Sequence, residues 1–63
     1  MSEHATYEAV ERKAHELFGA EYARHWLFKP NRTFAQLPPY EMAQSEVGAR
    51  LVLRELERTI LIE

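Results

Sequence analysis

Residues 25–53 read "HWLFKPNRTFAQLPPYEMAQSEVGARLVL" and bring together the tryptophan, two of the three phenylalanines and all three prolines of the chain. Pro30 disfavours helical backbone at the residue before it, so a helix arriving from the N-terminal side ends there. Pro39 suits the first turn of a new helix. The segment between these prolines is therefore predicted to be a turn followed by an extended crossing, with Phe34 and Leu37 as its anchors on the core.

The flanking segments predict three longer helices. The first is expected to start at a cap between Ser2 and Thr6 and to stop at Gly19, because glycine commonly follows a helix C-terminus. A second helix is expected at residues 20–28 and a last one at residues 46–59. Apolar side chains of the first helix recur at helical spacing, at Tyr7, Val10, Ala14, Leu17 and Phe18.

These elements predict an all-α protein, a small bundle of about four helices. Two N-terminal helices come first, and the proline-bounded connection follows. A short helix at "PYEMAQ" (39–44) then leads to a long C-terminal helix, which Ser45 can cap. Only the final "TILIE" (59–63) alternates well enough to allow a strand.

Composition excludes several classes of function. The chain of 63 residues has a net charge of −2, no cysteine, and no apolar run near the length of a membrane span, about 20 residues. The negative charge argues against nucleic acid as a partner of this chain. We expect one domain (1–63), cytoplasmic and without a signal peptide. Because so short a chain buries only about 60% of its unfolded surface, a partner or a second copy is expected to supplement its core.

Side chains capable of chemistry form no recognised catalytic or metal-binding pattern. His4, His15 and His25 lack the close spacing of a helical metal site. Two isolated glycines cannot build a phosphate loop, and no serine or threonine lies in a nucleophile elbow. We therefore expect no enzyme activity, no cofactor and no metal.

The last helix carries more apolar residues than one narrow stripe holds. Leu53, Leu56 and Ile60 make one line, and Val47 with Leu51 makes another. Two interpretations are open. Either both lines belong to a broad core-facing side, or one line faces the fold and the other a second chain.

A basic ridge runs along the same helix, because Arg50, Arg54 and Arg58 follow one another at four-residue spacing. Such a ridge could meet phosphate or an acidic partner. Three acidic residues flank it and favour a solvated face with local ion pairs instead: Glu46, Glu55 and Glu57.

The end of the chain, "ILIE" (60–63), places three large apolar residues where termini are usually polar. We expect Ile60, Leu61 and Ile62 to reach into a partner. The alternative is that they pack back on the first helix of the same chain or of a dimer mate.

Five short motifs occur in a set order along the chain. They read "LFG" (17–19), "WLFKPN" (26–31), "PPYEM" (38–42), "SEVGARLVLREL" (45–56) and "ER" (57–58). In order and spacing they resemble the toxin-binding domain of the MbcA/ParS/Xre antitoxins over about residues 14–58, which leaves residues 59–63 as a tail.

The resemblance implies an antitoxin-type domain that neutralises a RES-domain toxin, an NAD-degrading enzyme, by covering its active site. Family members use their C-terminal region for this. The expected partner-binding residues are therefore Arg50, Leu53, Arg54, Leu56, Arg58, Ile60, Leu61 and Ile62. Larger members also carry an N-terminal DNA-binding helix-turn-helix. We expect no room for such a helix-turn-helix before the first helix. The resemblance is therefore taken to imply toxin binding by this chain, and not DNA binding.

The chain departs from the family pattern in two places. The family usually has Leu-Gly-Gly after the Pro-Asn turn, whereas this chain has Phe34, Ala35 and Gln36, and losing both glycines narrows the backbone conformations available. The ending "ERTILIE" (57–63) replaces the usual Arg-Ile-Glu with a nearby glycine.

Two other functions compete with toxin binding. A small helical transcriptional regulator could use the arginine row on DNA, although the negative net charge opposes this. A homodimerisation module would explain the two apolar lines of the last helix.

Overall fold

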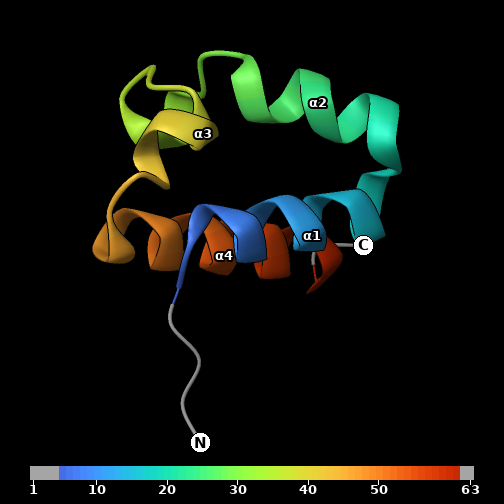
Figure 1. Cartoon of the computed structure of the whole chain (residues 1–63). Helices are drawn as coiled ribbons and strands as arrows, with labels where there is room; N and C mark the ends of the chain where they lie inside the picture. The colour runs from blue at the N-terminus through green and yellow to red at the C-terminus, as the bar shows by residue number, and fades with distance from the viewer. Residues whose placement is uncertain (1–4, 62–63) are drawn as a thin grey trace, which may run out of the picture.

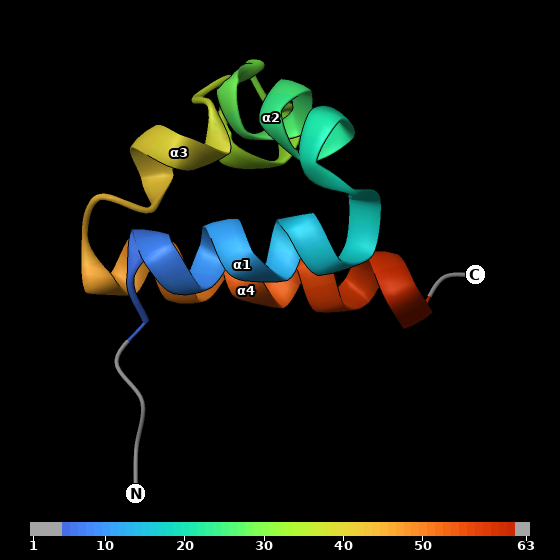
Figure 2. The same ribbon diagram turned by 45° about the vertical axis from the view of Figure 1, so that its right-hand side comes forward.

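The computed structural model describes the backbone of residues 5–61 and the side chains of residues 5–59. Its elements are α1 (Tyr7–Phe18), α2 (Ala20–Phe28), a 3-10 turn η1 (Arg32–Phe34), α3 (Pro39–Met42) and α4 (Glu46–Leu61). Helices α1 and α4 lie side by side and run in the same direction, while α2 returns above them and α3 links this upper layer to α4 (Figures 1 and 2). The predicted all-α fold is confirmed.

Local signals set the starts of α1 and α4 and the end of α1 where the sequence predicts them, whereas α3 ends at Met42, two residues before the predicted end. The Thr6 hydroxyl accepts a hydrogen bond from the Ala9 N–H at 3.1 Å, and the Ser45 hydroxyl accepts one from the Gly48 N–H at 3.0 Å. Gly19 separates α1 from α2 at a φ of 84°, a conformation that favours glycine. Each boundary depends on one residue, so it can be predicted without knowledge of the tertiary fold.

Helix α4 continues beyond the predicted end at Thr59 and includes Ile60 and Leu61. The strand alternative for residues 59–61 is therefore wrong. Alternation over five residues is too short a signal to override a helix that has already begun. Ile62 and Glu63 lie outside the described residues.

The core lies between the two helix layers and is made of small side chains. Five of the ten buried hydrophobic residues that the structure describes are alanines, which lets the helices approach closely. The largest fully buried side chains come from four different helices: Val10, Leu27, Pro39, Val52 and Leu56. Few large side chains are fully buried, so each of them carries a large share of the stability of this fold.

The connection between α2 and α3 is a compact loop and not an extended crossing. The Asn31 N–H donates to the Leu37 carbonyl at 3.2 Å, and the Gln36 N–H donates to the Asn31 carbonyl at 2.8 Å. The prediction for Phe34 is confirmed, since it is buried, but the prediction for Leu37 is wrong, since 43% of its surface is exposed. Because the loop closes on itself, it directs Phe34 inward and leaves Leu37 outside.

Ala35 and Gln36 adopt left-handed backbone, with φ of 59° and 73°. These are the two positions at which the resembled family usually has glycines. The loop therefore keeps a glycine-type backbone without glycine, at a cost of about 1 kcal/mol per residue.

Candidate protein-binding surface

The two apolar lines of α4 face different directions. Leu56 is fully buried together with Val52, so its side chain belongs to the core and is not offered to a partner in this structure. Val47 and Leu51 are instead 71% and 42% exposed. Among the described residues of α4, one line thus packs on the fold and the other faces outward.

Leu53 lies at the edge between these two faces. It is partly buried against the core and borders a shallow hollow shared with Ala9 and Lys13 of α1. Ile60 and Leu61 are helical, but their side chains lie outside the described residues, as do Ile62 and Glu63.

The arginine ridge makes local ion pairs, as its acidic flanks predict. A nitrogen of Arg50 lies 3.2 Å from a Glu46 carboxylate oxygen, and one of Arg58 lies 3.7 Å from Glu55. Arg54 makes no ion pair with any residue that the structure describes. Exposed pairs of this kind contribute only about 0–1 kcal/mol, so they can be exchanged for contacts with a partner at little cost.

An apolar hollow of about 420 Å³ lies beside the outward line of α4. Leu51 forms one side, and the loop side chains Phe34 and Leu37 form the other. Three charged residues also line it: Arg54, Glu55 and Arg58. An apolar floor with a charged border is the usual arrangement of a protein-binding site.

The partner-binding residues expected from the sequence did not include Val47, Leu51 or Leu37, although the Val47–Leu51 line was one of the two that could face a second chain. A signal for the first two exists, because Val47, Leu51, Arg54 and Arg58 follow the helical spacing of four, three and four residues and share one side of α4. Leu37 has no such signal, since its exposure depends on the closure of the loop.

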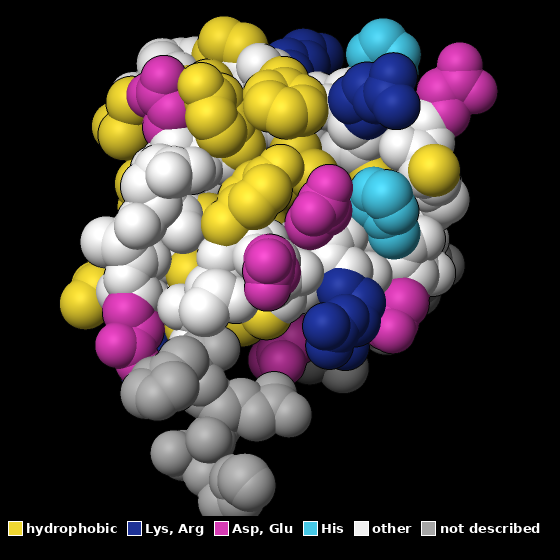
Figure 3. Space-filling model, in the orientation of Figure 1, with side chains coloured by type: hydrophobic (Ala, Val, Ile, Leu, Met, Phe, Trp, Pro, Cys, Tyr) yellow, Lys and Arg dark blue, Asp and Glu magenta, His cyan; other side chains and the backbone are white. Residues whose placement is uncertain are grey.

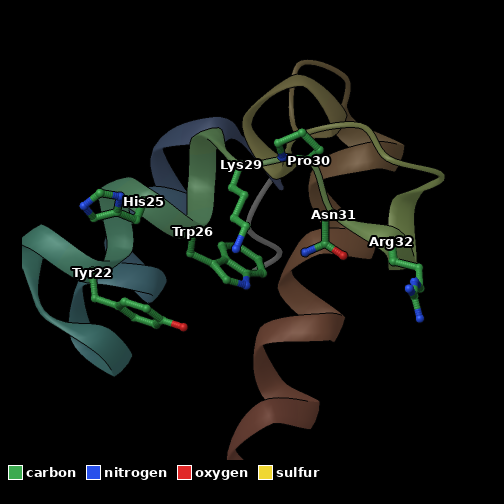
Figure 4. A pocket seen from close by; sticks show the side chains of 7 residues that line it. All are labelled: Tyr22, His25, Trp26, Lys29, Pro30, Asn31 and Arg32. Atoms are coloured by element: carbon green, nitrogen blue, oxygen red, sulfur yellow. The ribbon is translucent and has the colours of Figure 1, made fainter.

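A second hollow, of about 490 Å³, lies between α2 and the loop that begins at Asn31. Figure 4 shows the Trp26 indole near its middle, with the Tyr22 hydroxyl directed into the open space and the Lys29 side chain hanging into it. Asn31 and Arg32 border the far side, whereas the His25 ring points away. This hollow combines aromatic walls with cationic side chains.

Aromatic side chains pair on the outside of α2. The Phe18 ring lies 5.1 Å from Tyr22 in an edge-on arrangement and 5.8 Å from the half-buried Trp26. Phe28, which is 51% exposed, lies 4.8 Å from the Tyr40 ring. Hydrophobic side chains gather over α3 and the nearby end of α2 at the upper left of Figure 3.

The described residues contain no group of three His, Cys, Asp or Glu side chains that could hold a metal ion. Across the same part of the chain, no helix has both the length and the apolar character needed to cross a bilayer.

Comparison with protein families gives one result. A family model for the antitoxin Xre/MbcA/ParS C-terminal toxin-binding domain matches residues 13–59. Comparisons with curated proteins and with solved structures gave no significant match.

Proposed function

Because this chain belongs to the family of Xre/MbcA/ParS antitoxin C-terminal toxin-binding domains, we propose that it binds and neutralises a toxin. The protein acts by contact and not by catalysis. The observation that carries the proposal, beyond family membership, is the outward Val47–Leu51 line beside an apolar hollow.

The toxin is proposed to be a RES-domain enzyme that degrades NAD, as the motif resemblance implies. The outer side of α4 then lies over the active site of this enzyme. Arg50, Arg54 and Arg58 belong to this surface, and Leu53 forms its edge beside α1. Ile60, Leu61 and Ile62 would continue the surface at the end of the chain, while Leu56 supports it from the core.

Physical arguments favour this side of α4. Burying apolar side chains contributes about 25 cal/mol per Å² of surface, so the two exposed residues Val47 and Leu51 are natural anchors. The arginines around them would attract an acidic partner and speed association, especially at low salt.

The decisive experiment is co-expression of this protein with a RES-domain toxin and measurement of cellular NAD. Wild type is expected to preserve NAD. With Leu51→Glu, cellular NAD should fall again, because the new carboxylate would be buried without an ionic partner in the contact with the toxin. Ala20→Glu, an exposed change at the start of α2, is the matched control and should protect like wild type. NAD loss with wild type present would refute the proposed target.

Deleting residues 60–63 tests the tail. If the tail contacts the toxin, the deletion should leave the thermal midpoint nearly intact and weaken neutralisation. An unfolded deletion variant would place the tail in the core. A folded variant that still protects NAD would assign inhibition to the side of α4 alone.

Self-association is the second proposal, motivated by the small core and the same exposed Val47–Leu51 line, and a dimer formed through this line would compete with toxin binding. We expect a homodimer in the cytoplasm, and sedimentation equilibrium over a wide concentration range tests it. A stable monomer at every concentration would refute the dimer. The DNA-binding alternative is less well supported, because the chain has a net charge of −2 and acidic residues lie beside the arginines of α4.

A further inference from the structure

We propose that the hollow between α2 and the Asn31–Leu37 loop receives an acidic segment of the toxin. Carboxylates of that segment meet Lys29 and Arg32, and one of its apolar side chains lies against Trp26. The inference rests on the proposed function and specifies the chemistry of the partner.

The charge distribution supports an acidic occupant. Residues 22–40 contain Arg24, Lys29 and Arg32 but no aspartate or glutamate, although the whole chain has 10 acidic and 8 basic residues. Neither Lys29 nor Arg32 makes an ion pair with any described residue. The hollow therefore carries a local positive potential on a protein whose overall charge is negative.

The walls of the hollow are held in place before any partner arrives. Phe18 contacts both Tyr22 and Trp26, which fixes the aromatic side. On the other side, the Asn31 side chain accepts a hydrogen bond from the Thr33 N–H at 2.9 Å, so the backbone around Arg32 is fixed. A preorganised site of this kind loses less conformational entropy on binding.

The hollow is also joined to the proposed α4 surface by consecutive residues of one loop. Asn31 and Arg32 line it, and the next residues of the same loop, Thr33 to Ala35, line the apolar hollow beside Leu51. A partner seated on α4 therefore has this hollow at its edge. This connection favours a protein segment over a free nucleotide, for which two isolated glycines provide no phosphate loop.

The test uses the full chain and a RES-domain toxin. Lys29→Gln with Arg32→Gln should raise the Kd about tenfold or more at physiological salt and make binding less salt-dependent, because two charge contacts are lost. The control, Arg24→Gln on α2, removes one positive charge from an exposed side chain that does not line the hollow, and it is compared with Lys29→Gln alone. It should change the Kd by less than about twofold. If the first pair does not fold, Lys29→Gln alone replaces it.

Trp26 gives a direct second readout, because it is the only tryptophan in the chain. With fluorotryptophan incorporated, its fluorine NMR signal should shift when the toxin is added, and not when ADP or inorganic phosphate is added. A shift with ADP or phosphate but not with toxin would overturn the inference in favour of a small-anion site.

The remaining outcomes distinguish a failure of the proposed toxin binding from a failure of the inference about the hollow. Failure of wild type to bind the toxin would refute the proposed function, and the inference would fall with it. Binding by wild type that is equally tight in the Lys29/Arg32 variant would overturn the inference alone. A loss of affinity in Arg24→Gln equal to that in Lys29→Gln would also overturn it, because the effect would then come from net charge and not from the hollow.

Discussion

The α-carbon of Gly48 packs against the Met42 carbonyl, and no space remains between them for a side chain. This contact joins the end of α3 to the first turn of α4, where the Gly48 N–H also donates to the Ser45 hydroxyl. It sets how closely α4 approaches α3. The outward direction of Val47 and Leu51 depends on that approach.

Gly48→Ala should destabilise the protein by about 3 kcal/mol or more, because the new methyl group collides with backbone that cannot move aside cheaply. Helix propensity alone predicts that the same substitution would stabilise the protein by about 1 kcal/mol. Chemical denaturation followed by circular dichroism measures the change. An unchanged or raised free energy of unfolding would show that α3 and α4 can separate without cost.

Ala35→Gly and Gln36→Gly should each stabilise the protein by about 0.5–1 kcal/mol, because both positions have left-handed backbone. The control is Glu57→Gly at an exposed position inside α4, which should destabilise the protein by about 1 kcal/mol. Thermal melting of the three variants tests the prediction. A loss of stability at residues 35 and 36 would mean that their side chains contribute more than the strain costs.

Leu56→Ala and Leu51→Ala should separate stability from binding. Leu56 is fully buried, so its truncation should cost about 2–5 kcal/mol and unfold much of the population of so small a domain. Leu51 is 42% exposed, so its truncation should cost less than about 1 kcal/mol while weakening toxin binding. Melting curves and titration with the toxin measure the two effects. Equal melting points for the two variants would contradict the assignment of Leu56 to the core and of Leu51 to the exposed surface.

Stability should fall at alkaline pH because of Tyr7. Burial raises the pKa of its phenol above the ordinary value of 10.0, with smaller contributions from the charges of Glu11 and Tyr40. The unfolded chain then loses this proton first, so the stabilisation is complete below pH 10.0 and declines as the pH rises through the folded pKa. Tyr7→Phe should reduce the fall in melting temperature above that pH. An identical fall in the variant would assign it to other groups.

The starts of the helices and the end of α1 were determined by the sequence, because each depends on a few adjacent residues. Thr6, Gly19 and Ser45 cap or stop helices through bonds to backbone groups within four residues of themselves. Pro30 and Pro39 act through their own rings. The order of these local signals along the chain also produced the resemblance to the antitoxin family. The family model that matches residues 13–59 confirms this resemblance.

The binding surface was decided by the tertiary structure. The sequence shows two apolar lines on α4, but only the packing of α1 and α3 determines that Leu56 is inside and Leu51 outside. Leu37 is exposed because Asn31 closes the loop from six residues away, and Ala35 and Gln36 take a glycine-type backbone for the same reason. Helix signals act over one turn, whereas the face that a helix leaves open depends on contacts between segments distant in the sequence.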